Sequence, residues 1–258
     1  MTISDTATTS WIRRYKPTEG ADVRLVCFPH AGGSASYFNS VAARFSPGVD
    51  VVALQYPGRQ DRRREPVLRD LGELADLVTA ELLRLREVPT VFFGHSMGAV
   101  LAFECAWRME EKGLADPQTL LLSGRRAPSA LRDEQTYRGD DARLLAELRQ
   151  LNGTSSALLE DDDILRMALD TLRGDLEAVE TYVDSGHRVT VPLVVLTGDD
   201  DPKTTVTEAQ RWCEHTESTC RVLTYPGGHF YLDRHAAAVG DVVAAELAKV
   251  RPTTIGAH

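Results

Sequence analysis

A serine between two glycines has the sequence setting of a nucleophile. Ser96 lies in Gly94-His95-Ser96-Met97-Gly98, which matches the pattern G-x-S-x-G. An apolar run ends at Gly94, and a helical pattern begins directly after the serine, as expected where a strand turns sharply into a helix. Such a turn lifts the hydroxyl above the sheet and holds it at a helix N-terminus, which favours developing negative charge. We therefore predict a nucleophilic Ser96; the alternative is a serine that only caps the helix.

A serine nucleophile needs a general base, and the sequence offers seven histidines. His229 directly follows the last predicted strand, so it should lie at the same edge of the sheet as Ser96. We predict that His229 is the base; the alternative is a histidine in a surface loop. His95 should point away from the reacting face and serve the structure. The other histidines lie in loops, helical segments or the tail, at His30, His187, His215, His235 and His258.

The carboxylate that orients the base should follow the penultimate strand, where "VVLTGDDDP" supplies three aspartates. The spacing G-x-x-D after this strand, common in α/β-hydrolases, favours Asp201. Asp200 and Asp199 remain alternatives, and otherwise face solvent or cap the next helix. The chain order Ser, Asp, His is that of the α/β-hydrolases.

Two backbone amides are needed to stabilise the oxyanion of an acyl-transfer intermediate. One should be the amide of Met97, directly after the nucleophile. The other should come from the loop "CFPHAGGSASYF", where Gly32 and Gly33 permit close approach of the backbone and Ala31 is the predicted donor. The alternative for this loop is an ordinary strand-to-helix turn.

These residues are spaced along an alternation of apolar strands and helices. Continuous apolar runs, expected where helices cover both faces of a sheet, predict strands at 23–28, 49–56, 90–94, 119–124, 191–198 and 220–226. Helical patterns lie near 36–45, 70–87, 97–113, 205–216 and 234–250. The alternation predicts an α/β fold with a doubly wound, mostly parallel sheet.

The interval from about 132 to 187 interrupts this alternation with acidic, amphipathic helical segments and no strand. An insertion of about 55 residues into a compact domain is usually functional. We therefore predict one domain over 1–258 with a helical lid at about 132–187. The alternative is a helical subdomain that only packs.

The composition narrows the class of partner. The chain has 258 residues and a formal net charge of -9, which argues against nucleic acid as the main partner. None of the four cysteines is spaced as in a metal site, and Cys213 and Cys220 are interpreted as thiols. The N-terminus has neither a signal peptide nor a membrane span, which indicates a cytoplasmic protein with a short flexible tail.

Six segments follow one another along the chain: CFPHAGGSASYF, LQYPGRQDR, FFGHSMGA, LLLSGRRAP, LTGDDDP and GGHFYL. In this combination nearly the whole chain, from about 10 to 250, resembles the type II thioesterases of polyketide and nonribosomal peptide biosynthesis. YPGR and SGRRAP are more specific than the serine motif. The resemblance implies the α/β-hydrolase fold and an editing enzyme that hydrolyses stalled acyl groups from the phosphopantetheine arm of carrier proteins. It implies an acyl-serine intermediate, no metal or organic cofactor, and a monomer.

The resemblance also implies that the lid shapes an acyl chamber. Its apolar residues either line this chamber or pack the lid against itself; the candidates are Leu158, Leu159, Ile164, Met167 and Leu172.

A basic cluster follows two predicted strands. We expect some of these residues to attract an acidic carrier protein or the phosphate of its arm; they are Arg59, Arg62, Arg63, Arg64, Arg125 and Arg126. The alternative is local ion pairing with Asp61, Glu65 and the acidic lid.

Three other functions compete with editing. A product-releasing thioesterase uses the same residues, but we expect a free-standing enzyme because no carrier-like segment or linker precedes the domain. A general carboxylesterase or lipase shares the fold. A non-catalytic binding module is also possible on this fold, although a complete set of serine, histidine and acid argues against it.

Overall fold

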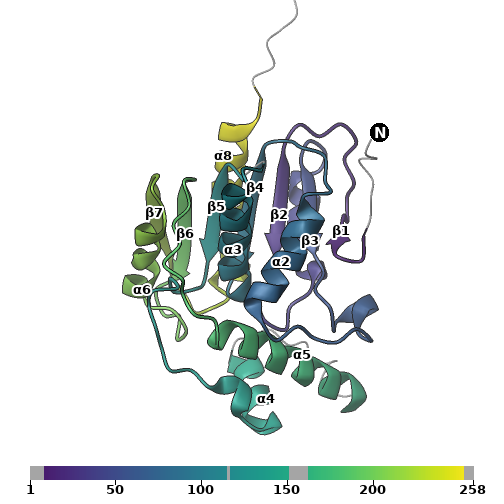
Figure 1. Cartoon of the computed structure of the whole chain (residues 1–258), viewed down its shortest axis with the longest axis vertical. Coiled ribbons are helices and arrows are strands. Elements are labelled where there is room, and N and C mark those ends of the chain that lie inside the picture. Colours follow the sequence, from purple (N-terminus) through teal and green to yellow (C-terminus); the bar gives the residue numbers. More distant parts are fainter. Residues whose placement is uncertain (1–8, 115–116, 151–161, 253–258) are drawn as a thin grey trace, which may run out of the picture.

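The computed structural model describes residues 9–114, 117–150 and 162–252. A sheet lies at its centre with the strand order β1-β3-β2-β4-β5-β6-β7, shown in Figure 1. All neighbouring strands are parallel except β1 and β3, which are antiparallel. The strands are β1 (Ile12–Arg13), β2 (Arg24–Phe28), β3 (Asp50–Leu54), β4 (Thr90–His95), β5 (Thr119–Ser123), β6 (Leu193–Gly198) and β7 (Cys220–Tyr225).

Six of these strands are the ones that the apolar runs predict, so the mostly parallel sheet is confirmed. Strand β1 was not predicted, because two residues are too few to show a pattern. Ile12 and Arg13 pair with Leu54 and Ala53, and Ile12 is fully buried. The expectation of a flexible N-terminal tail is therefore wrong for these residues, which form one edge of the sheet.

Helices cover both faces of the sheet. In Figure 1, α2 (Leu71–Leu82) and α3 (Met97–Glu111) lie in front of it, and α8 (Ala236–Val250) lies behind. Helix α2 ends earlier than its pattern predicts. The shorter elements are the helices α1 (Asn39–Phe45), α6 (Val206–Gln210) and α7 (Tyr231–Arg234) and the 3-10 turns η1 (Ala35–Phe38), η2 (Gln60–Arg62), η3 (Thr136–Arg138) and η5 (Arg211–His215).

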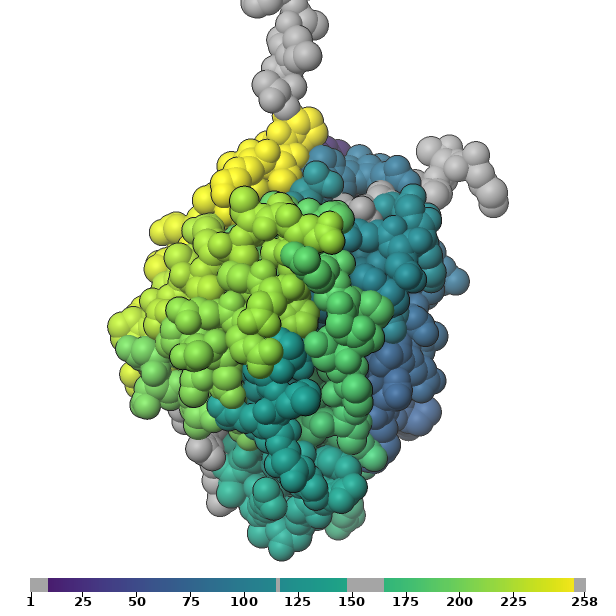
Figure 2. Space-filling model, turned by 60° about the vertical axis from the view of Figure 1, so that its left-hand side comes forward, coloured from purple at the N-terminus to yellow at the C-terminus, as the bar shows by residue number. Residues whose placement is uncertain are grey.

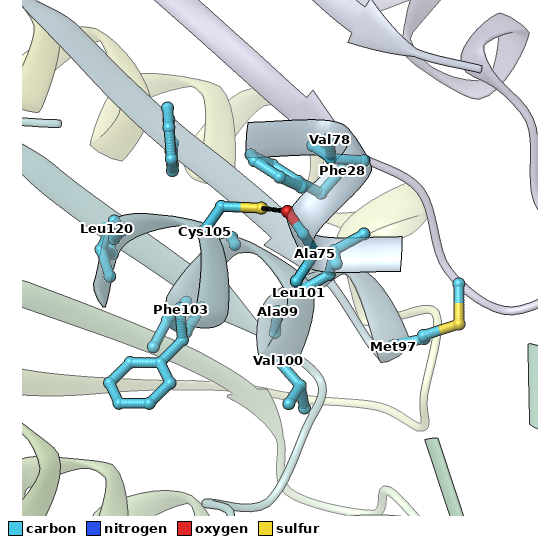
Figure 3. Close-up of a cluster of buried hydrophobic side chains, with 14 of the residues drawn as sticks. Phe28, Ala75, Val78, Met97, Ala99, Val100, Leu101, Phe103, Cys105 and Leu120 are labelled. Carbon is cyan, nitrogen blue, oxygen red and sulfur yellow. Dashed lines mark hydrogen bonds between the residues drawn. The ribbon is translucent and has the colours of Figure 1, made fainter. Parts of the chain in front are cut away.

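Helix α3 is buried on nearly all sides, as its largely apolar sequence requires. Figure 3 shows Val100, Leu101 and Phe103 of this helix within the larger hydrophobic cluster, together with Cys105, whose thiol contacts the carbonyl oxygen of Ala75 on α2 at 3.7 Å. Burial raises the pKa of Cys105 to about 12, so this thiol acts as a small apolar side chain. The packing holds the start of α3 rigidly at the end of β4.

Cys213 and Cys220 form a disulfide, with their Cα atoms 5.2 Å apart. This corrects the interpretation of the two residues as thiols. The physical reason is that η5 ends beside the start of β7, which brings both cysteines to the same place.

The predicted lid interval contains η3, α4 (Asp141–Gln150) and α5 (Asp162–Glu180), and no strand within its described residues. Figure 1 places α4 and α5 beneath the sheet, and the contacts of α5 with the loops after β2 and β3 put it at the carboxyl ends of the strands. None of the described helices has the length and apolar character needed to span a membrane.

The lid residues that were expected to line an acyl chamber lie in different environments. Leu172 is fully buried in a cluster with Leu144, Leu169 and Leu176, so it packs the lid helices together and against Ala31. Met167 is 41% exposed and lines an outer depression. Leu158, Leu159 and the side chain of Ile164 lie outside the described residues.

Candidate active site

Ser96 sits on a strained turn between β4 and α3. Its backbone has φ 56° and ψ -121°, a conformation that costs free energy for a residue with a side chain. Its amide donates to the carbonyl oxygen of Ser123 at 2.8 Å, which ties the turn to β5. A Cβ added to Gly94 would lie 2.1 Å from the carbonyl oxygen of Gly98, so the turn closes only with glycine at position 94. The helix dipole of α3 therefore begins directly beneath the Ser96 hydroxyl.

The structure brings Ser96, His229 and Asp201 into one hydrogen-bonded chain. The Oγ atom of Ser96 lies 3.0 Å from Nε2 of His229. On the other side of the ring, Nδ1 lies 2.9 Å from Oδ2 and 3.1 Å from Oδ1 of Asp201. Both the imidazole and the carboxylate are almost completely buried. This is the arrangement in which a carboxylate orients a histidine that takes the proton of a serine.

Two backbone features hold His229 and Asp201 at this distance. The amide of Lys203 donates to Oδ1 of Asp201 at 2.8 Å, which fixes the carboxylate in the turn after β6. A Cβ on Gly198 would lie 2.2 Å from the carbonyl oxygen of Gly227, so the loops after β6 and β7 pack with no space between them. The base and the acid are thus positioned by neighbouring loops.

The three consecutive aspartates have different surroundings. Asp199 and Asp200 are exposed, and Asp199 accepts a hydrogen bond from the amide of Gly227 at 2.8 Å. Asp201 is buried and is the member of the three that contacts His229. The geometry therefore favours Asp201 over both alternatives.

The predicted oxyanion donors occupy suitable places. Met97 is the first residue of α3, and Ala31 follows β2 in the loop that lines the same pocket as Ser96. Within the described residues, neither amide donates a hydrogen bond to the protein. The next amide, that of Gly32, is already used, because it donates to Asp175 at 2.7 Å. The loop thus leaves the amide of Ala31 free.

Two further histidines lie beside His229. His95 is fully buried, and its Nδ1 atom pairs at 2.9 Å with Ser123 Oγ, which in turn contacts Tyr231. Burial, and secondarily the proximity of His229, lowers the pKa of His95 well below its usual value. The same causes lower the pKa of His30 to about 3. Both rings are neutral at physiological pH, so they place no second positive charge next to the base.

The remaining described histidines lie elsewhere. His187 stacks on Trp107, His215 pairs with Ser129, and His235 contacts the carbonyl oxygen of Pro226. His258 lies outside the described residues.

The pocket beside Ser96 is small and is lined partly by charged residues of the lid and of the loops after β5 and β6. Figure 2 shows the teal segment after β5 passing between the yellow-green residues near β7 and the green helix α5. Lys203 pairs with Glu147 of α4. Sequence patterns do not single out the acidic lining, because an isolated glutamate in a loop or an amphipathic helix resembles a solvent-facing residue. These acidic residues are Glu134, Glu147 and Glu180.

The basic cluster is largely buried, which corrects part of the expected carrier contact. Arg59 is 7% exposed and pairs with Asp175 of α5. Arg62 is 5% exposed and pairs with Glu65. Surfaces that are covered by their own chain cannot meet a carrier protein, whereas Arg63 and Arg64 are exposed.

The second pair of arginines is also buried. Arg126 pairs with Glu134 at 2.6 Å. Arg125 lines the pocket beside Ser96, and burial, followed by the charge of Arg126, lowers its pKa to about 10. Neither side chain belongs to the outer surface.

Among the described residues, no cluster of histidine, cysteine, aspartate or glutamate could hold a metal ion.

Comparison with known proteins agrees with this geometry. Residues 23–246 match the family model of the thioesterase domain. A probable cadicidin biosynthesis thioesterase of Streptomyces griseus is 56% identical over 96% of this chain and 68% of its own length. The thioesterase PikA5 of Streptomyces venezuelae is 46% identical over 86% of this chain and 80% of its own.

Among solved structures, the type II thioesterase BorB from the borrelidin biosynthetic cluster superposes with a TM-score of 0.87 at 45% identity, covering 94% of this chain and 99% of its own. The chain is therefore a thioesterase of the α/β-hydrolase fold, and it belongs to the type II thioesterases of polyketide and nonribosomal peptide biosynthesis.

Proposed function

We propose that this enzyme edits a synthase by hydrolysing stalled acyl groups from the phosphopantetheine arm of its carrier proteins. The observation that carries the proposal is the hydrogen-bonded chain from Ser96 through His229 to Asp201, beside two free amides. These groups supply a nucleophile, a base and oxyanion donors, so the reaction needs no metal or organic cofactor.

The first half of the reaction transfers the acyl group to the enzyme. Nε2 of His229 takes the proton of Ser96 while Oγ attacks the thioester carbonyl carbon, and the amides of Met97 and Ala31 stabilise the oxyanion. The carbon–sulfur bond then breaks, the protonated histidine returns its proton to the pantetheine sulfur, and an acyl-serine ester remains. Asp201 accepts a hydrogen bond from Nδ1, which stabilises the imidazolium while it carries the proton.

The second half releases the acid. A water molecule gives a proton to Nε2 of His229 and attacks the ester carbonyl carbon. The tetrahedral intermediate collapses, Ser96 takes the proton back, and the free carboxylic acid leaves. In both halves His229 first takes a proton and then returns it, whereas Ser96 is the nucleophile in the first half and the leaving group in the second.

The partner in this proposal is an acyl or peptidyl carrier protein. Arg63 and Arg64 are exposed after β3, at the edge of the sheet that holds Ser96. Their charge would aid encounter with an acidic carrier more than final affinity. Replacing both by glutamate should slow hydrolysis of carrier-bound acyl groups and leave free thioesters unaffected. Lys112→Glu, exposed at the opposite end of α3, is the control.

The editing role is tested with acyl groups of varied length and branching, offered on a carrier protein, as free thioesters and as oxygen esters. We expect short, aberrant acyl groups on the carrier to be hydrolysed fastest. A preference for the full-length product would indicate product release, and equal turnover of oxygen esters would indicate a general esterase.

The nucleophile is tested by mass spectrometry of the enzyme after brief reaction with an acyl carrier. An acyl adduct should form on Ser96 and disappear in Ser96→Ala, whereas Ser40→Ala, an exposed serine, should retain it. Absence of any adduct together with absence of hydrolysis would support a non-catalytic binding module instead.

A further inference from the structure

The lid helix α5 is joined to the oxyanion loop by a buried ion pair. Arg59 directs two nitrogens at the two carboxylate oxygens of Asp175, with Nη1–Oδ2 and Nη2–Oδ1 distances of 2.8 Å each. Arg59 is 7% exposed and Asp175 is 1% exposed. This bidentate geometry fixes both the orientation of the two side chains and the distance between them, which a single charge contact does not.

Both members of this pair also bind the backbone of the oxyanion loop. Oδ2 of Asp175 accepts the amide hydrogen of Gly32 at 2.7 Å. Nη1 of Arg59 donates to the carbonyl oxygen of Gly33 at 2.9 Å. These two loop residues directly follow Ala31, whose amide is the proposed oxyanion donor. The pair therefore anchors the loop directly after that amide, and the amide of Gly33 donates to the carbonyl oxygen of His30 at 2.9 Å, which links this anchor to the peptide group of Ala31.

The pair holds Gly32 in the conformation that the loop needs. Gly32 has φ +72°, and a Cβ there would lie 3.3 Å from Leu172 of α5. The glycine therefore lets the lid helix approach the loop closely, while its amide points at Asp175. The amide of Ala31 is left for the substrate.

A second contact docks α5 on the segment that follows β3. Thr171 donates through Oγ1 to the carbonyl oxygen of Gly58 at 2.8 Å. Gly58 and Gly174 both pack against Val67, where an added Cβ would lie 2.4 Å and 2.5 Å from its side chain. The motif YPGR thus forms the docking site of the lid helix and ends in the arginine that holds the oxyanion loop.

From these contacts we infer that Arg59 and Asp175 are positioning residues, which align the oxyanion loop only while helix α5 is docked. Withdrawal of α5 removes the acceptor of the Gly32 amide and leaves Arg59 without its counter-ion. The loop then loses its anchor at Gly32, and the arginine that binds Gly33 is no longer held in place. Stabilisation of the transition state is thereby coupled to the position of the lid. The inference rests on the proposed roles of Ser96 and Ala31.

The first test compares Asp175→Asn with Asp170→Asn. Both replacements lie on α5 and remove a carboxylate that is paired with an arginine. The pair of Asp170 with Arg69 is exposed, however, and neither side chain binds the oxyanion loop. Loss of an oxyanion donor costs on the order of 10²–10³ in kcat, so partial misalignment should cost about 10- to 100-fold. We expect this loss in Asp175→Asn, with little change in KM, and wild-type kinetics in Asp170→Asn.

A second measurement separates positioning from a general loss of structure. A trifluoromethyl ketone analogue of the substrate forms a tetrahedral oxyanion on Ser96, so its inhibition constant reports on the oxyanion donors. Asp175→Asn should weaken this inhibitor by about the same factor as it lowers kcat/KM. It should leave binding of the intact thioester unchanged when measured in a Ser96→Ala background. Equal inhibition of wild type and Asp175→Asn would overturn the inference.

A double variant distinguishes the loss of positioning from the effect of an unpaired buried charge. Arg59→Met with Asp175→Leu removes both buried charges, and replacing a buried pair by apolar residues is often tolerated. We expect this variant to fold, as judged by circular dichroism, and to keep the low kcat of Asp175→Asn. Wild-type kcat in the double variant would show that the single variant suffered only from an unpaired charge, and the inference would fail.

The assays use an acyl N-acetylcysteamine thioester, which needs no carrier protein. Failure of the editing proposal would show in the wild type, as a missing preference for carrier-bound substrates. Failure of the present inference would show as equal kinetics and inhibition in the Asp175 and Asp170 variants.

Discussion

Gly98 in the first turn of α3 packs directly on the backbone of Phe28 at the end of β2. A Cβ added to Gly98 would lie 2.1 Å from the carbonyl oxygen of Phe28 and 2.7 Å from that of Pro29. This contact sets the separation of the two chain segments that carry the amides of Met97 and Ala31. The second glycine of the G-x-S-x-G motif is thus required by the neighbouring strand as well as by the turn.

Gly98→Ala should therefore damage stability and activity together. Relief of the overlap requires movement of β2 or α3, which should lower the free energy of unfolding by about 1–3 kcal/mol. Displacement of the donors by about 1 Å should lower kcat on the order of 10²-fold. Urea unfolding and thioester kinetics measure the two effects. Gly228→Ala is the control for stability, since the nearest atom to its added Cβ lies 3.7 Å away. An unchanged free energy of unfolding in Gly98→Ala would contradict the argument.

The three aspartates after β6 should differ sharply in their effect on turnover. Asp201→Asn places an amide beside Nδ1 of His229, which favours the wrong tautomer, and should lower kcat by about 10⁴-fold. Asp200→Asn, at an exposed position, should leave turnover unchanged. Steady-state kinetics on a carrier-bound acyl group check both. A comparable loss of turnover in Asp200→Asn would contradict the assignment of Asp201 as the acid.

The main sheet could be predicted from the sequence because its inner strands are buried on both faces and appear as continuous apolar runs. The positions of Ser96, Asp201 and His229 followed from the same reasoning, since parallel strands bring the loops at their carboxyl ends together. Strand β1 could not be predicted, because a strand of two residues has no pattern of its own. Ile12 and Arg13 become an edge strand only by pairing with Leu54 and Ala53.

The role of Arg59 could not be predicted for a different reason. Its partner Asp175 lies in an acidic amphipathic helix, where an aspartate is expected to face water. Only the docking of α5 on the loop after β3 shows that this carboxylate is buried. Long-range pairing of charges has no periodic signal in the sequence, so the sequence offers pairing with the acidic lid only as an alternative to a carrier contact and does not identify Asp175 as the partner.

The disulfide between Cys213 and Cys220 should contribute measurably to stability. A loop of this length restricts the unfolded chain by roughly 2.5 kcal/mol in the chain-entropy estimate. Dithiothreitol should therefore lower the free energy of unfolding of the wild type by about that amount. A Cys213→Ala, Cys220→Ala double variant should resemble the reduced protein and not respond to reductant. If wild type and variant unfold alike under oxidising conditions, the bond adds nothing to stability.

Burial of His30 should make stability depend on pH below neutrality. The folded protein keeps this ring neutral down to pH 3, because burial, then the charges of His229 and Arg59, lower its pKa to about 3. The unfolded chain binds a proton at His30 near its ordinary pKa of about 6.5. Protons therefore favour the unfolded state, and the free energy of unfolding falls as pH drops from 6.5 towards 3.

Replacing His30 by phenylalanine removes this share of the pH dependence. Phenylalanine also suits the site, because His30 packs edge-on against Tyr37 and Phe230. The slope of unfolding free energy against pH should decrease by up to about 1.4 kcal/mol per pH unit between these limits. Urea unfolding at several pH values measures the slopes of wild type and variant. The variant should keep part of the pH dependence, because burial also lowers the pKa of His95. A variant with the wild-type slope would mean that His30 takes up its proton in the folded enzyme as readily as in the unfolded chain.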